Sequence, residues 1–186
     1  MGYAKSLYMK QIINVILLLG AVCLTSCQEV YLRAQLKQMI GTTVILPEKI
    51  SCVYNGEIIP MEDSLRTMPK LFVFVDSTEC STCKISEFIR YEEVFSLAHT
   101  VGSFVPLIFL TTKKDDYEAI VEHLSLIELF CPVFLDDEFI FRTLNRTIPD
   151  DSRFHTFFMD ENNRICVIGD PSIKRDLVDI FQSHIN

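Results

Sequence analysis

Two continuous apolar runs, 71–75 and 105–110, dominate the pattern of hydrophobic and polar positions. Such a run is typical of a strand that is covered on both faces. Each run precedes a segment with apolar residues at helical spacing, over 84–98 and 115–127. Because strands alternate with helices, the pattern predicts an α/β fold in which a central sheet has helices on both faces.

Shorter elements surround this centre. The pattern predicts strands over 42–46, 50–54, 57–59, 133–135, 154–159 and 164–168, and helices over 29–40, 137–144 and from 170 onward. Asn55-Gly56 favours a two-residue turn, so its flanking strands are expected to form a hairpin that adds antiparallel strands to the sheet. Asp170-Pro171 is typical of a helix start, with an N-cap residue followed by proline.

The first 26 residues have the layout of an export signal. Lys5 and Lys10 precede the apolar stretch 12–19 and give it a positive start. The stretch is shorter than the roughly 20 residues of a membrane-spanning helix. The stretch leads to Leu24-Thr25-Ser26-Cys27, which resembles the lipobox of bacterial lipoproteins. This resemblance implies that Cys27 is acylated and becomes the first residue after cleavage, which anchors the chain to a membrane of the bacterial cell envelope. An ordinary signal peptide or an uncleaved anchor is the alternative.

The chain that follows residues 1–26 has 160 residues, the size of one domain. We therefore expect a tether over 27–40 and a single domain over 41–186. The whole chain has a net charge of −8, and the leader holds two lysines and no acidic residue, so the remaining chain carries −10. Such an acidic surface argues against nucleic acid as a partner.

Cys80-Ser81-Thr82-Cys83 lies where the first buried strand is expected to turn into a helix. At a helix start, free backbone N–H groups and the positive end of the helix dipole stabilise the thiolate of the first cysteine. Cys83, one turn further on, is placed to attack a mixed disulfide on Cys80 and release the partner. An exported chain also meets conditions in which disulfides form. The motif therefore predicts thiol–disulfide exchange.

Three further cysteines, Cys52, Cys131 and Cys166, stand singly in the sequence, and we expect each to be a buried small apolar residue. An odd number cannot all pair within one molecule, and a bridge between Cys131 and Cys166 is left open. Zinc would need two more ligands at suitable spacing beside the paired cysteines, and scattered single cysteines do not supply them.

Two stretches of this chain, 71–84 with the paired cysteines and 156–165 with its strand–turn–strand pattern, resemble the thioredoxin-like superfamily. The similarity is strongest to TlpA-like and redoxin-like exported thiol–disulfide oxidoreductases, and it covers roughly residues 41–186. It implies a thioredoxin-like three-layer fold, with a central mixed sheet flanked by helices and an N-terminal β-hairpin extension. It also implies that Cys80 is the nucleophile and Cys83 the resolving thiol, that protein thiols and disulfides in the cell envelope are the partners, and that no dissociable cofactor is needed.

The chain departs from that family at three places. Glu79 replaces an aromatic residue, and its carboxylate is expected to oppose the Cys80 thiolate, while Lys84 modestly favours it. Phe154 stands where the family has a cis-proline; because a cis bond before another residue costs about 2.5–4 kcal/mol, we expect a trans bond or a shifted loop. Phe74 occupies the position of a buried proton acceptor, for which Asp76 is the nearest substitute.

His155 follows Phe154 in the segment that the family brings close to the cysteines. It could shuttle a proton or join both thiolates around copper, although a surface or structural histidine fits the pattern better. The sequence thus favours a lipid-anchored thiol–disulfide oxidoreductase of the cell envelope. The alternatives are a non-catalytic thioredoxin-like binding module and a copper-handling protein that uses the two cysteines and a histidine.

Overall fold

A computed structural model describes residues 29–48, 50–54, 57–127, 129 and 131–185, together with residue 14. Apart from residue 14, the predicted leader and Cys27, the expected acylation site, lie outside these residues, as does the predicted turn Asn55-Gly56. The chain divides into two compact units, Met1–Lys37 and Gln38–Asn186. Residues 29–39 are helical, close to the predicted helix over 29–40. No helix among the described residues has the length and apolar character needed to cross a membrane.

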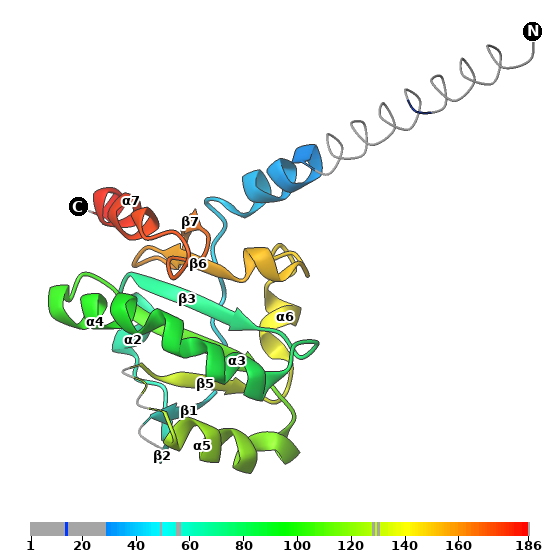
Figure 1. Cartoon of the computed structure of the whole chain (residues 1–186), viewed down its shortest axis with the longest axis vertical. Helices are drawn as coiled ribbons and strands as arrows, with labels where there is room; N and C mark the ends of the chain where they lie inside the picture. Colours follow the sequence, from blue (N-terminus) through cyan, green and yellow to red (C-terminus); the bar gives the residue numbers. More distant parts are fainter. Residues whose placement is uncertain are drawn as a thin grey trace, which may run out of the picture. The chain divides into compact units, whose positions relative to one another are not determined.

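The second unit is built on a seven-stranded mixed sheet in the order β2-β1-β5-β4-β3-β6-β7 (Figure 1). Its strands are β1 (Ser51–Tyr54), β2 (Glu57–Pro60), β3 (Lys70–Val75), β4 (Val105–Thr111), β5 (Val133–Asp136), β6 (Thr156–Met159) and β7 (Ile165–Ile168). β3, β4 and β5 run parallel, and the other neighbouring pairs run antiparallel. This confirms the predicted hairpin, which joins the sheet where Val53 of β1 pairs with Val133 of β5.

The helices are α2 (Ser64–Thr67), α3 (Ser81–Glu87), α4 (Glu92–Val101), α5 (Tyr117–Ser125), α6 (Ile140–Leu144) and α7 (Asp176–Ile185), with 3-10 turns η1 (Phe88–Tyr91), η2 (Lys114–Asp116) and η3 (Ser152–Phe154). The predicted helix over 84–98 is therefore divided by η1. The predicted helix start at 170 was wrong, because α7 begins only at Asp176. Asp170 instead caps a separate turn, in which its side chain accepts from the backbone N–H of Ser172 at 2.8 Å.

The two faces of the sheet have different cores. Since side chains alternate along a strand, Leu71, Val73 and Val75 point to one face and Phe72 and Phe74 to the other. The first face packs in one buried cluster with residues of α3, α4, α5 and α7. On the second face, phenylalanine rings stack around Phe141 of α6; they belong to Phe72, Phe74 and Phe109, with Phe134 and Phe157 beside them. Helices on both faces confirm the predicted three-layer arrangement.

The predicted strand over 42–46 was wrong, since only Thr43 makes a bridge, to Arg164. At Ile45 the main chain bonds to a side chain instead of to a neighbouring strand. The amide of Asn145 accepts from the backbone N–H of Ile45 at 2.8 Å and donates to the Ile45 carbonyl at 2.9 Å. The main chain at Ile45 is thus satisfied without a neighbouring strand.

Candidate functional site

The paired cysteines lie at the carboxyl end of β3, at the start of α3. Cys80 and Cys83 form a disulfide with their Cα atoms 5.3 Å apart, and both residues are exposed. Cys80 is the N-cap residue of α3, and the backbone N–H of Cys83 donates to its Sγ at 3.4 Å. The predicted N–H support for the first sulfur is therefore present.

Asp76 fixes the loop between β3 and the cysteines. One carboxylate oxygen accepts from the backbone N–H of Thr78 at 3.2 Å and from the hydroxyl of Ser77 at 3.2 Å. The other accepts from Nε of Arg142 at 2.6 Å. Burial favours a higher pKa for Asp76, but the bonds from Arg142 and Thr78 outweigh it, and the pKa lies below its ordinary value. Because a carboxyl group with a lowered pKa is a weaker base, Asp76 is a poor substitute for the family's buried proton acceptor.

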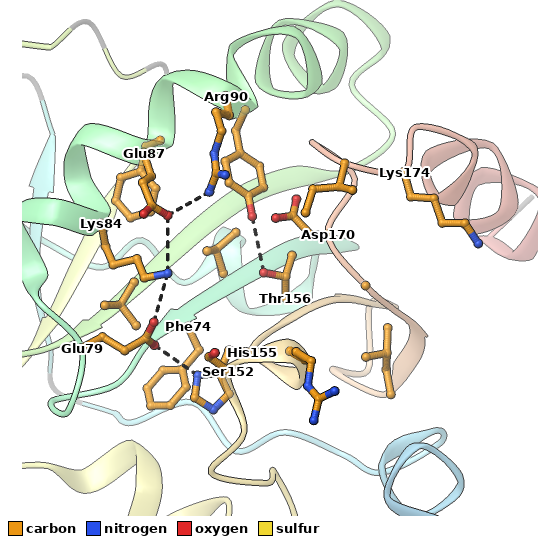
Figure 2. Close-up of a pocket in the computed structure, with 18 of the residues that line it drawn as sticks. Phe74, Glu79, Lys84, Glu87, Arg90, Ser152, His155, Thr156, Asp170 and Lys174 are labelled. Atoms are coloured by element: carbon orange, nitrogen blue, oxygen red, sulfur yellow. Dashed lines mark hydrogen bonds and ion pairs between the residues drawn. The ribbon is translucent and has the colours of Figure 1, made fainter. Parts of the chain in front are cut away.

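The Glu79 carboxylate lies between two side-chain donors, Lys84 and His155 (Figure 2). Its Oε2 lies 3.1 Å from Nζ of Lys84, and its Oε1 lies 3.4 Å from Nδ1 of His155 and 3.3 Å from the backbone nitrogen of Asp76. The expected repulsion of the Cys80 thiolate is reduced, because a neighbouring cation offsets the carboxylate charge. Lys84 also lies 3.4 Å from Glu87, so its ammonium is engaged by two carboxylates. Burial lowers the pKa of Lys84, but these carboxylates raise it above its ordinary value.

His155 is a buried structural residue, with a side chain only 3% exposed. Its ring meets the edge of Phe74 at 4.9 Å between centroids. Nδ1 faces Glu79, while Nε2 lies 3.0 Å from the Pro149 carbonyl and 3.2 Å from Nη2 of Arg142. Both ring nitrogens thus have partners other than a cysteine. Among the described residues no group of three His, Cys, Asp or Glu side chains is arranged to hold a metal ion, so the copper alternative gains no support from the site.

Phe154 lies in η3 and not in a strand, and its side chain is buried. The turn is capped by Asp151, whose carboxylate accepts from the backbone N–H of Arg153 at 3.1 Å. The described part of the chain contains no cis peptide bond, as expected from the absence of proline here. The segment that replaces the proline loop is therefore an ordinary capped turn.

The other three cysteines in the described part of the chain are free thiols. Cys52 and Cys131 are buried, as predicted, whereas Cys166 is only half-buried. Burial, with a smaller effect of Glu62, raises the pKa of Cys52 to about 12, and burial raises that of Cys131 further. The bridge left open between Cys131 and Cys166 is not formed.

A cavity of about 790 Å³ lies between α3, η1, η3 and the segment after β7 (Figure 2). Glu79 and Lys84, the residues on either side of the paired cysteines, both line it. Tyr91 and Thr156 also line it, with their side-chain oxygens 3.5 Å apart. Arg142, which contacts Asp76 and His155, was not predicted as part of the site. Its one available signal was a lone cation in a short, mainly apolar helix.

A scan of the sequence against protein-family models finds no match, and a search of curated proteins also finds none. Solved structures do match. AhpC from Enterococcus faecalis superposes with a TM-score of 0.54 at 12% identity, covering 78% of this chain and 92% of its own. A protein from Chlorobium tepidum described as the thiol:disulfide interchange protein DsbE gives 0.52 at 12% identity, covering 79% and 99%.

The chain has a thioredoxin-like fold. A PrxQ mutant from Xylella fastidiosa superposes equally well, with a TM-score of 0.52 at 11% identity over 79% of this chain and 97% of its own. The thioredoxin-like fold predicted from the two sequence stretches is thus confirmed. It carries a paired-cysteine motif at the end of β3, with the ion-paired Glu79 in place of the expected aromatic residue and the buried Phe154 in place of the expected proline.

Proposed function

We propose that the protein is a thiol–disulfide oxidoreductase of the cell envelope that exchanges disulfides with protein partners through Cys80 and Cys83. The observation that carries the proposal is the exposed disulfide between these residues at the N-terminus of α3. An exposed disulfide within reach of a free thiolate is open to attack, whereas a buried one is inert.

The exchange needs only sulfur chemistry. In the reduced protein, the Cys80 thiolate attacks a partner disulfide, a bond forms between Cys80 and one partner sulfur, and the other partner sulfur leaves as a thiolate. The Cys83 thiolate then attacks the Cys80 sulfur, which re-forms the internal disulfide and releases the second partner thiolate. Two electrons pass from the protein to the partner, and the reverse sequence oxidises a partner dithiol. The direction follows from the two reduction potentials.

The cell-envelope location rests on the leader and on Leu24-Thr25-Ser26-Cys27, which resembles a lipobox. Acylation of Cys27 would tether the domain to a membrane while the paired cysteines face an oxidising compartment. Fatty-acid labelling of the full chain tests this: we expect label on the wild type and on the Cys23→Ala control, and none on Cys27→Ala. Label on Cys27→Ala would overturn the proposed anchor.

Thiol trapping with mass spectrometry at defined glutathione ratios tests the exchange. We expect a reversible Cys80–Cys83 disulfide and, for Cys83→Ala, mixed disulfides trapped on Cys80. The control is Cys166→Ala, which removes another accessible thiol and should leave cycling intact. If the pair never cycles between dithiol and disulfide, the exchange activity is wrong and a non-catalytic binding module is favoured.

A further inference from the structure

The guanidinium of Arg142 joins four segments around the disulfide. Nε bonds to Asp76 in the loop before the cysteines. Nη1 donates to the carbonyls of Ile148 and Pro149 at 2.8 and 3.3 Å. Nη2 lies 3.3 Å from Oδ1 of Asp150 and 3.2 Å from Nε2 of His155. The group also lies over the Phe74 ring, 5.1 Å from its centroid. With a side chain only 21% exposed, Arg142 is held in one position.

The contacts of His155 with Arg142 and Glu79 favour one arrangement of the ring proton. Arginine can only donate and a carboxylate can only accept, so both contacts are satisfied when Nε2 accepts from Arg142 and Nδ1–H donates to Oε1 of Glu79. The alternative, with the proton on Nε2, satisfies only the Pro149 carbonyl, 3.0 Å away.

Glu79 directly precedes Cys80, so the direction of its carboxylate matters for the nucleophile. His155 holds one oxygen, and Lys84 holds the other at 3.1 Å. Figure 2 shows the carboxylate between these two partners, on the wall of the cavity. Without these two contacts, the Glu79 carboxylate can turn toward Cys80. Its negative charge would then disfavour the thiolate form of Cys80 and raise the pKa of that thiol.

We propose that Arg142 is a positioning residue for Cys80: through His155 it holds the Glu79 carboxylate against the cavity wall and away from the nucleophilic sulfur. Arg142 contacts His155 directly and also bonds to Asp76 in the loop before Cys80, so the test must separate the route through His155 and Glu79 from an effect on that loop. The proposal rests on the proposed function only in taking Cys80 as the attacking thiol.

A double-mutant cycle on the reduced full chain tests whether Arg142 acts on Cys80 through Glu79. The readout is the rate at which iodoacetamide alkylates Cys80 from pH 5 to 9, followed by mass spectrometry, because this rate reports the thiolate fraction. We expect Arg142→Met to lower the rate at pH 7 by about threefold or more, given the strength of a partly screened charge at this range. In the Glu79→Gln background the same substitution should change the rate little.

The second variant is His155→Phe, which keeps an aromatic ring of similar size against Phe74 and removes the donor to Glu79. It should lower the rate as Arg142→Met does, again only when Glu79 is present, so the test stands even if Arg142→Met does not fold. Alkylation of Cys166 in the same samples serves as an internal control and should not change. Equal losses with and without Glu79, or no loss in either variant, would overturn the proposal.

This readout separates the two hypotheses. Alkylation of the reduced Cys80 thiol needs no partner protein and no disulfide cycling. If coupling through Glu79 is found while the glutathione titration shows no cycling, the positioning role stands and the proposed oxidoreductase fails. If cycling occurs without coupling, the proposed function stands and the positioning role fails.

Discussion

Nε of Arg142 lies 2.6 Å from Oδ2 of Asp76, which bonds helix α6 directly to the loop before the disulfide. The side chains are 21% and 11% exposed, so the pair lies largely out of water. Because removing one partner leaves the other charge poorly compensated, the pair matters more to stability than a surface ion pair does.

We expect Asp76→Asn to lower the free energy of unfolding by about 2 kcal/mol at pH 7, somewhat less than for a fully buried pair. The measurement is urea denaturation. The matched control is Asp151→Asn, which breaks the more exposed pair with Arg153 and should cost well under 1 kcal/mol. Similar losses in the two variants would contradict the assigned burial of the Asp76 pair.

The same pair predicts a pH dependence. The pKa of Asp76 is lower in the folded protein than in the unfolded chain, so the unfolded state binds more protons in acid. The stabilisation is therefore complete above the unfolded-state pKa of about 3.9 and is lost as the pH falls through the folded-state value. The difference in unfolding free energy between wild type and Asp76→Asn should shrink below about pH 4. A difference that stays constant from pH 7 to 2.5 would refute this.

Lys70 predicts a second rise of stability with pH, in the basic range. Its side chain is fully buried, with Nζ 2.7 Å from Oδ1 of Asn163, and burial lowers the pKa of Lys70 to about 8 despite the opposing effect of Asp160. Between pH 8 and about 10.4 the unfolded chain therefore binds more protons, so stability rises with pH. Wild type should gain stability relative to Lys70→Met over that window, measured by denaturation at each pH. A flat difference would show that Lys70 titrates normally.

The free thiols should react in a fixed order in the reduced native protein. We expect iodoacetamide to modify Cys80 first and Cys166 more slowly, since burial and nearby Asp160 raise the pKa of Cys166. Cys52 and Cys131 are buried with raised pKa values and should react only after unfolding. Peptide mass spectrometry at timed intervals gives the order. Early modification of Cys52 or Cys131 would contradict the described core.

Gly169 lines the cavity with φ at +140°, and a Cβ there would lie 2.8 Å from Cδ1 of Leu177. We expect Gly169→Ala to cost about 2–3 kcal/mol in thermal or urea unfolding, because backbone strain and displacement of Leu177 add together. Gly102→Ala is the matched control, since Gly102 also has positive φ but open space at the Cβ position. It should cost about 1–2 kcal/mol. Equal losses of stability in the two variants would mean that the Leu177 side chain moves aside at no measurable cost.

Much of the fold was predictable because local patterns agree with it. The apolar runs became β3 and β4, and Asn55-Gly56 lies between the two strands of the predicted hairpin. The absence of a strand over 42–46 was not predictable, because the side chain of Asn145, one hundred residues away, bonds to the main-chain groups of Ile45. Local propensity contains no information about such a partner.

The site was predictable only in part, for a similar reason. Spacing alone placed Cys80 and Cys83 at the junction of β3 and α3. Lys84 is only five positions from Glu79, but spacing alone did not show that its ammonium pairs with the Glu79 carboxylate. The other partner, His155, lies 76 positions away, so the sequence suggested repulsion where the structure has a paired carboxylate. Arg142 bonds to Asp76 from 66 positions away, and nothing in its neighbourhood marks it as part of the site.

The outer strands of the sheet have a consequence for how the protein would release a partner. β2 and β7 are only four residues long; β2 ends in Pro60, which has no backbone N–H, and Thr43 bridges to Arg164 beside β7. Short, interrupted edges are poor templates for added strands. If the protein exchanges disulfides as proposed, a partner joined to it through one sulfur finds little backbone to pair with at these edges. Cleavage of that single bond would then be enough to release it.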